Sequence, residues 1–233
     1  NPGVASTLAT GGPGMVKAAY STGKPALGVG PGNGPVYIER TANILRAVND
    51  IVLSKTFDNG MICATENSAV IDNEIYDEVK ANFVKNGVYF VPKKEQGKLA
   101  EAMFDPQRGS VRGPIAGKSA KAIAKLAGIK VPDNTKVLAA ELTGVGKKFP
   151  LSAEKLSPVI SVYKAKSHED AFAICEALLN FGGLGHTAAI QTTDDDIALK
   201  FGVKMKAARV LVNTPGGFGG IGNLYNEMTP SLT

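Results

Sequence analysis

The sequence predicts an α/β fold in which helices flank a mainly parallel β-sheet. Short segments rich in Val and Ile alternate with segments whose apolar residues recur every three or four positions, and this alternation is typical of parallel sheets. The 233 residues include 44% hydrophobic and 20% charged side chains, which is ordinary for a globular protein. The chain therefore has the size of one large domain or two small ones.

The first residues predict a β-turn-helix-β unit. A strand is expected over Val4–Ala9, a glycine-rich turn over Gly11–Gly14, a helix over Met15–Tyr20 and a second strand over Pro25–Val29. Such a unit needs neighbouring strands to bury both of its faces. We therefore expect it to be the end of a larger sheet, and the chain to be part of a longer protein.

From residue 35 onward, strands and helices alternate. Ile44, Val48 and Ile51 share one helical face, and Asp58–Gly60 then breaks the chain. The expected strands are Pro35–Glu39, Ala69–Ile71, Tyr89–Val91, Val137–Leu142, Pro158–Tyr163, His186–Gln191 and Arg209–Asn213. Further helices are expected through Ile75, Val79 and Phe83, and over Lys118–Ala127, Glu169–Leu179 and Asp195–Phe201.

Charge and composition exclude several classes of function. The 26 basic and 21 acidic residues give a net charge of +5, and with 6% aromatic residues and no Trp this does not indicate a nucleic-acid binder. Two cysteines and two histidines argue against a disulfide framework and a structural zinc site. No stretch reaches the roughly 18–20 apolar residues of a membrane span. We expect a cytoplasmic protein without a metal, a nucleic-acid partner or a membrane partner.

Lysines gather between residues 93 and 98 and between residues 118 and 130. Such lysines are typical of the solvated faces of amphipathic helices. They would also attract a polyanion such as a nucleotide or coenzyme A.

Cys63 is the first candidate for chemistry. It follows the Asp58–Gly60 break and precedes a strand, where a rigid scaffold presents a side chain on a loop. A thiol is a good nucleophile for a carbonyl carbon near neutral pH. Position alone also allows a small buried apolar residue. Cys175, within an apolar helical segment, is expected in the core.

Two glycine clusters have different contexts. Gly217–Gly222 matches G-x-G-x-x-G, but only 11 residues follow it, too few for a dinucleotide-binding unit. Gly11–Gly14 stands between a strand and a helix, where bare amides can approach a ligand closely. Taken alone, His186 is more typical of a structural histidine and Glu154 of a surface carboxylate.

Five segments together resemble a known family. They are residues 8–33, 54–67 (SKTFDNGMICATEN), 153–163 (AEKLSPVISVY), 182–190 (GGLGHTAAI) and 209–222 (RVLVNTPGGFGGIG). They resemble the aldehyde dehydrogenase superfamily, and within it the CoA-acylating branch, most closely the aldehyde dehydrogenase half of bifunctional aldehyde-alcohol dehydrogenases. The resemblance implies that residues 1–33 end a Rossmann-type cofactor domain and that residues 34–233 form the catalytic domain.

The resemblance also assigns roles to residues. It implies that Cys63 is the catalytic thiol and that His186 lies near this thiol or coenzyme A. Glu154 would hold the nicotinamide ribose of NAD, and the cofactor would also contact the residues Gly11, Gly12 and Leu156. We add Asn33 as a local candidate for stabilising the oxyanion.

The missing carboxylate favours the acylating branch. Hydrolytic members carry a glutamate in an E-L-G-G segment, whereas this chain has Leu27–Asn33 there and no carboxylate before Glu39. Water needs a base to attack a thioester, but a thiol needs far less help. We therefore expect NAD-dependent oxidation of a short-chain aldehyde, first of all acetaldehyde, to acyl-CoA by a homo-oligomer (dimer or higher). The alternatives are a hydrolytic aldehyde dehydrogenase and a non-catalytic oligomerising fragment.

Overall fold

The computed structural model describes residues 3–107, 109–222 and 227–230, and its centre is a seven-stranded sheet in the order β5-β6-β7-β4-β3-β8-β9. Every neighbouring pair of its strands is parallel, which confirms the predicted fold class. The strands are β3 (Pro35–Ile38), β4 (Ser68–Asp72), β5 (Val88–Phe90), β6 (Val137–Glu141), β7 (Val159–Ala165), β8 (Gly185–Gln191) and β9 (Ala207–Val212).

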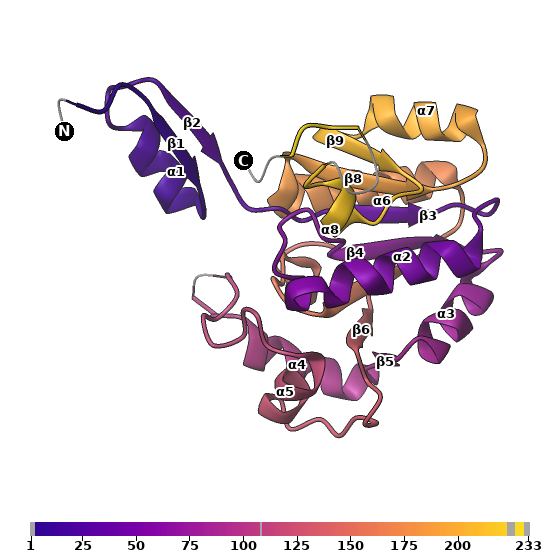
Figure 1. Ribbon diagram of the computed structural model, residues 1–233. Helices are drawn as coiled ribbons and strands as arrows, with labels where there is room; N and C mark the ends of the chain where they lie inside the picture. The colour runs from indigo at the N-terminus through magenta and orange to yellow at the C-terminus, as the bar shows by residue number, and fades with distance from the viewer. Residues whose placement is uncertain (1–2, 108, 223–226, 231–233) are drawn as a thin grey trace.

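Helices cover both faces of this sheet (Figure 1). They are α2 (Ile44–Thr56), α3 (Tyr76–Lys85), α4 (Lys93–Met103), α5 (Ala120–Leu126), α6 (His168–Leu178), α7 (Asp195–Lys204) and α8 (Gly216–Gly219), with short turns η1 (Phe57–Gly60), η2 (Pro150–Ser152) and η3 (Leu179–Gly183). In the described ranges, no helix combines the length and apolarity needed to cross a bilayer.

The core explains the run of apolar residues in the central strands. All side chains of β3 and β4 are buried, because α2 and α3 cover one face of the sheet while α6 and α7 cover the other. Cys175 lies fully buried in the α6 side of the core, as expected, and burial raises the pKa of its thiol. The lysines of α4 and α5 are exposed, in agreement with solvated helix faces.

The N-terminal unit consists of β1 (Thr7–Thr10), α1 (Pro13–Tyr20) and β2 (Ala26–Val29), with β1 and β2 paired in parallel. It stands apart from the seven-stranded sheet (Figure 1). The first strand begins at Thr7 rather than at residue 4, because ladder pairing starts where the Thr7 N–H donates to Pro25. Leu8 and Leu27 are 66% and 69% exposed. The division into domains at residue 33 stays a prediction.

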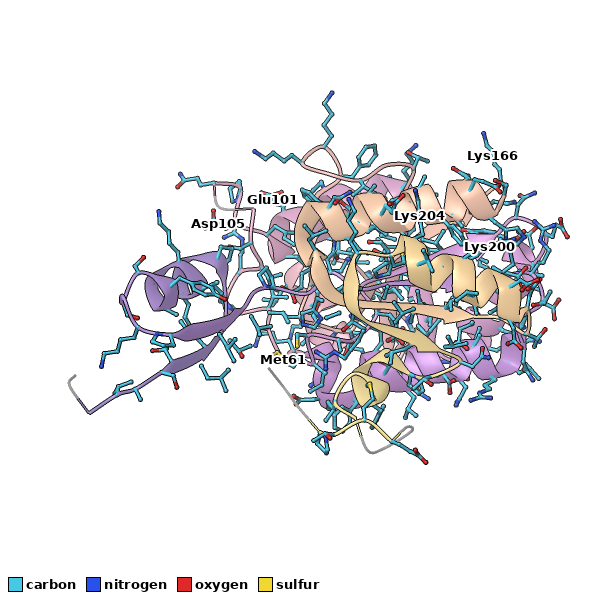
Figure 2. The ribbon with its side chains drawn as sticks, turned by 90° about the horizontal axis from the view of Figure 1, so that it is seen from above. Met61, Glu101, Asp105, Lys166, Lys200 and Lys204 are labelled. Atoms are coloured by element: carbon cyan, nitrogen blue, oxygen red, sulfur yellow. The ribbon has the colours of Figure 1, made fainter. Side chains whose placement is uncertain are left out.

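The predicted break after α2 is a tight reversal of the backbone. Asp58, Asn59 and Gly60 have φ angles of 47°, 49° and 69°, a left-handed run that no helix can continue. Gly60 needs to be glycine, because a Cβ there would lie 2.6 Å from the Ser157 carbonyl oxygen. This turn directs the chain towards Cys63. Figure 2 places Met61 on the side of the sheet that faces the N-terminal unit.

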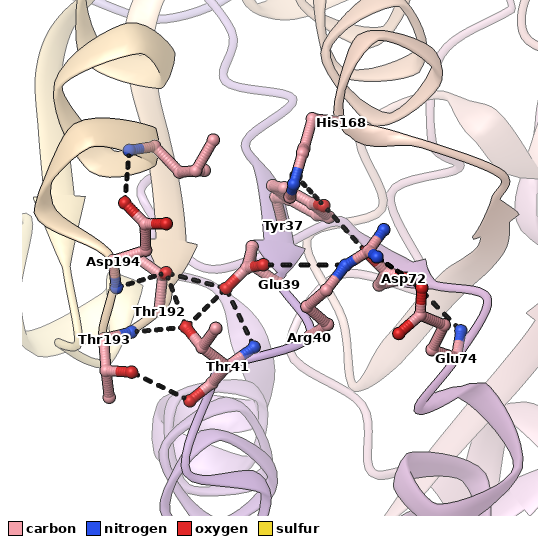
Figure 3. Close-up of polar contacts among 11 residues, drawn as sticks. Tyr37, Glu39, Arg40, Thr41, Asp72, Glu74, His168, Thr192, Thr193 and Asp194 are labelled. Atoms are coloured by element: carbon pink, nitrogen blue, oxygen red, sulfur yellow. Dashed lines mark hydrogen bonds and ion pairs between the residues drawn. The ribbon is translucent and has the colours of Figure 1, made fainter.

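A polar network occupies the carboxyl edge of the sheet (Figure 3). The Arg40 Nε donates to Asp72 Oδ2 at 2.9 Å, and the Tyr37 hydroxyl lies 3.0 Å from His168 Nδ1. Glu39 Oε2 accepts hydrogen bonds from the Thr41 N–H and from the Thr192 hydroxyl. Glu39, Asp72 and His168 have the spacing of metal ligands, but the Arg40 guanidinium already supplies positive charge there.

Candidate active site around Cys63

The candidate residues gather at the opposite, amino edge of the sheet. Cys63 precedes β4 and Glu154 precedes β7, while Asn33 precedes β3 and His186 is the second residue of β8. Since all the strands run parallel, their amino ends meet at one edge. The topology thus gathers side chains that lie up to 153 positions apart in the sequence.

Gly32 is the meeting point of three of these residues. Its N–H donates to Glu154 Oε1 at 2.9 Å. A Cβ on Gly32 would lie 2.3 Å from the Cys63 carbonyl oxygen and 3.4 Å from His186 Cδ2. The linker between the N-terminal unit and β3 therefore packs against Cys63, Glu154 and His186 at once, and only glycine fits there.

The thiol of Cys63 is half-buried in a mixed electrostatic environment. Burial and the Glu154 carboxylate raise its pKa, whereas Arg209 and the backbone N–H groups of Cys63 and Ala64 act to lower it. The balance leaves the pKa of this thiol above its ordinary value of 9.0. Formation of the nucleophilic thiolate therefore needs an acceptor for the proton.

Glu154 is suited to accept that proton. Burial raises the pKa of its carboxyl to about 7, against the lowering effects of the Gly32 N–H, Lys55 and Lys155. Near neutral pH the group thus exists in both protonation states, which suits a general acid or base. Glu154 is partly buried rather than a free surface carboxylate.

Two buried lysines, Lys55 and Lys155, act on the Glu154 carboxylate, and they were not predicted from the sequence. Lys155 donates from Nζ to the carbonyls of Asn67 and Ala153, each at 2.9 Å. Lys55 is fully buried, and its Nζ has no hydrogen-bond partner among the described residues. Burial lowers the pKa of Lys55 to about 8. The periodicity of α2 could have predicted the burial of Lys55, because this residue lies one helical turn after the buried Ile51.

His186 is 6% exposed at the start of β8. Its Nδ1 lies 3.0 Å from the Thr187 hydroxyl, and its buried Nε2 has no partner among the described residues. Burial and the charge of Arg209 lower its pKa, so the imidazole is neutral near pH 7 and can accept a proton. His186 also lines a cavity of about 390 Å³, together with Gly28–Pro31 and with Leu179, Asn180, Gly182, Leu184 and Gly185.

Asn33 does not fit the oxyanion role expected for it. Its amide Nδ2 donates to the Ser152 carbonyl at 2.9 Å and to the Leu178 carbonyl at 3.1 Å. Both N–H groups of the amide are therefore committed to backbone carbonyls. Asn33 instead fastens the linker to the catalytic sheet.

Gly11, Gly12 and Leu156 remain predicted cofactor contacts. Gly12 caps the N-terminus of α1, and a Cβ there would have no neighbour within 4 Å. The Gly11 N–H donates to Val29, so it is used inside the N-terminal unit. Leu156 has a φ angle of 42°. For a leucine this left-handed conformation is strained, and such strain is typical of functional sites.

The second glycine cluster packs against the Cys63 loop. The Gly216 N–H donates to Glu66 Oε1 at 2.6 Å and the Gly217 N–H to Ser54 Oγ at 2.7 Å. A Cβ on Gly220 would lie 2.3 Å from the Ala64 Cβ. Close packing thus accounts for these glycines, in agreement with the expectation that they are no dinucleotide fingerprint.

Comparison with known proteins identifies the class. The model of the aldehyde dehydrogenase family matches residues 9–223, so the chain belongs to this family. The chain is similar to an aldehyde-alcohol dehydrogenase of Streptococcus pneumoniae, with 52% identity over 238 residues. That alignment covers 99% of this chain and 27% of the relative, so the chain spans about a quarter of that relative's length.

Solved structures show the same kinship. An acetylating aldehyde dehydrogenase from Geobacillus thermoglucosidasius has a TM-score of 0.94 and 47% identity, covering 98% of this chain and 50% of that one. A propionaldehyde dehydrogenase from Rhodopseudomonas palustris, solved with bound CoA and an acylated cysteine, has a TM-score of 0.86 and 30% identity. This match covers 97% of the present chain and 51% of the propionaldehyde dehydrogenase chain.

Proposed function

We propose that the chain carries the catalytic thiol of a CoA-acylating, NAD-linked aldehyde dehydrogenase. The reaction converts aldehyde, coenzyme A and NAD⁺ reversibly into acyl-CoA, NADH and a proton. The observation that carries this proposal is the packing of Cys63, Glu154 and His186 around Gly32. The similarity to acetylating and propionaldehyde dehydrogenases supports it.

The first step is addition of the Cys63 thiolate to the aldehyde carbon. Sγ forms a bond to this carbon, and the carbonyl oxygen becomes the oxyanion of a thiohemiacetal. We infer that the backbone N–H groups of Cys63 and Ala64, which act on the thiol, also stabilise that oxyanion. Glu154 takes the proton that the thiol loses.

Glu154 also fits the ribose of a nicotinamide cofactor. Its Oε1 accepts from the Gly32 N–H, while among the described residues no donor bonds to its Oε2. A carboxylate oxygen at this place makes charge-assisted hydrogen bonds to ribose hydroxyls. A nicotinamide held there would supply the acceptor for the hydride of the thiohemiacetal, and Cys63 would then carry a thioester.

Coenzyme A completes the reaction. Neutral His186 accepts the proton of the CoA thiol, the CoA sulfur bonds to the acyl carbon, and the bond from this carbon to Cys63 Sγ breaks. The leaving Cys63 thiolate takes back the proton held by Glu154, and His186 releases its proton to solvent as the proton of the overall reaction, which restores the starting enzyme. His186 lines a cavity together with Gly28–Pro31, and this cavity offers room for the CoA thiol beside the proton acceptor.

The proposal extends to organisation and substrate. We infer that residues 1–33 close the cofactor domain and that residues 34–233 are catalytic, which the separate β1–β2 sheet supports. Acetaldehyde is the proposed substrate. The expected homo-oligomer rests on the resemblance alone, and the expected cytoplasmic location rests on the low cysteine content.

One observation favours hydrolysis as the alternative. The absence of a carboxylate before Glu39 argued against a base that activates water. Glu154, which acts on the Cys63 thiol and has a pKa of about 7, could serve as such a base instead. Product analysis separates the two reactions in the longer protein that contains this chain. With acetaldehyde and NAD⁺, we expect acetyl-CoA only when coenzyme A is present, and little acetate without it. Equal NADH formation without coenzyme A, with acetate as the product, would overturn the proposal.

A further inference from the structure

Arg209 lies on β9, on the face of the sheet that α2 covers. It is paired in register with Thr187 of β8, and Leu211, two residues further on, packs in the core beneath α2. Arg209 therefore lies next to the start of β8, which carries His186, although the His186 side chain projects from the other face of the sheet. The α2 face, to which Arg209 belongs, is also the side of the Cys63 loop that follows α2. None of the roles assigned so far uses this arginine.

The guanidinium of Arg209 is tied to the segment that supports Cys63. Its Nη1 donates to the carbonyl of Gly220. Gly220 packs directly on Ala64, the residue after Cys63. The Nε of Arg209 is buried without a hydrogen-bond partner in the described residues. An unpaired donor is costly in a folded protein, so its retention points to a task other than stability.

We propose that Arg209 is a positioning residue whose fixed positive charge favours the thiolate of Cys63 and the neutral form of His186. The inference rests on the proposed function, in which Cys63 attacks and His186 accepts a proton. A guanidinium is suited to this task because it stays protonated at all relevant pH values. One cation thus prepares both the nucleophile and the base.

The charges around the two groups support this assignment. Arg209 and the Glu154 carboxylate are the charged side chains that act on Cys63, and they act in opposite directions. Arg209 is also the charged side chain that acts on His186, where it adds to the effect of burial. Without Arg209, only the backbone N–H groups of Cys63 and Ala64 would act against burial and the Glu154 carboxylate.

The test measures the pH dependence of Cys63 alkylation by iodoacetamide, read by mass spectrometry, in the wild-type chain and in Arg209 variants. Arg209→Gln keeps a donor for the Gly220 carbonyl but removes the charge, and Arg209→Met removes both. In each, we expect alkylation near pH 7 to slow by about fivefold or more and the profile to shift to higher pH. Arg209→Lys should restore most of the rate.

The controls separate charge from structure. Arg46 also donates to a backbone carbonyl, that of Asn213, and Arg46→Gln should leave the profile unchanged. Cys175 reports folding, because only an unfolded chain exposes it. Should both neutral variants unfold, the wild-type chain decides: NMR titration of His186 must give a pKa below the ordinary 6.5.

Unchanged alkylation profiles in folded neutral variants would overturn the proposal, as would a His186 pKa at or above 6.5. Such results leave the proposed function intact if Cys63 still forms the acyl-enzyme. If instead the wild-type protein, with Arg209 in place, forms no acyl-enzyme on Cys63, the proposed function itself is contradicted.

Discussion

The two edges of the parallel sheet differ in how their buried polar groups are hydrogen-bonded. At the carboxyl edge, Asp72 and Glu39 accept hydrogen bonds from several donors and face Arg40 (Figure 3). At the amino edge, buried polar atoms of Lys55 and His186 lack partners among the described residues, and burial brings the pKa values of Glu154 and Lys55 to about 7 and about 8, close to neutral pH. The first edge has the features of a structural network, and the second those of a reaction site.

This arrangement departs from the common rule for open α/β sheets, in which ligands bind beyond the carboxyl ends of the strands. Here the linker Gly30–Gly34 passes over the amino ends and places the N-terminal unit on that side. The position of the linker, rather than the sheet itself, thus explains why the candidate site lies at the amino edge.

The largest expected effect separates the two cysteines. In the longer protein, Cys63→Ser should reduce kcat for NADH formation by on the order of a thousandfold or more, because a hydroxyl is far harder to ionise than a thiol. Circular dichroism should show an unchanged fold. Cys175→Ser is the matched control and should keep its activity. More than a few per cent of residual activity in Cys63→Ser would remove this thiol from the mechanism.

Glu154→Gln should weaken catalysis by about 1–3 kcal/mol, or roughly five- to 150-fold, because the ribose hydroxyls lose a charged acceptor. Steady-state kinetics with NAD⁺ as the varied substrate measure this effect. Wild-type kcat and wild-type NAD⁺ affinity in this variant would contradict both roles proposed for Glu154.

The same variant should change the pH dependence of stability. The pKa of Glu154 is raised to about 7 in the folded state from 4.5, so the folded chain holds this proton more tightly than the unfolded chain. This contribution to stability is present below pH 4.5 and is lost as pH rises to 7. Thermal unfolding should therefore show that Glu154→Gln gains Tm over wild type at pH 8 but not at pH 4. The opposite order would place the carboxylate in a favourable ion pair.

At the carboxyl edge, Asp72→Asn should affect stability alone. Losing the charge that faces Arg40 should cost about 1–3 kcal/mol in the free energy of unfolding. Urea denaturation measures this loss, and alkylation of Cys63 should proceed at the wild-type rate. A slower reaction at Cys63 would show that the two edges are coupled.

Much of the fold was predictable because each element has a local pattern. The apolar runs of β3 and β7 and the periodicity of α2 are visible in short stretches of sequence. The order of the strands and the site at their amino edge are set by contacts across long separations. Resemblance to a family supplied the pairing of Cys63 with Glu154, which no local pattern contains.

The misses have physical causes. Asn33 stands beside glycines and suggests a free amide, but its two acceptors lie 119 and 145 positions further along the chain. Lys55 was missed because lysine is rarely buried, and only its counter-charges Glu66 and Glu154 explain its place. Arg209 was part of a recognised segment, yet its position next to the start of β8 depends on the pairing of β8 with β9, and its position near the Cys63 loop depends on the contacts of Gly220.

Trapping the acyl-enzyme tests the central claim most directly. The longer protein is incubated with acetyl-CoA in the absence of NADH, quenched in acid and digested, and each cysteine peptide is weighed by mass spectrometry. We expect the acetyl group on Cys63 and none on Cys175, with no adduct in the Cys63→Ser variant. Acetyl-CoA that leaves Cys63 unmodified while the protein still reduces NAD⁺ with acetaldehyde would contradict the account.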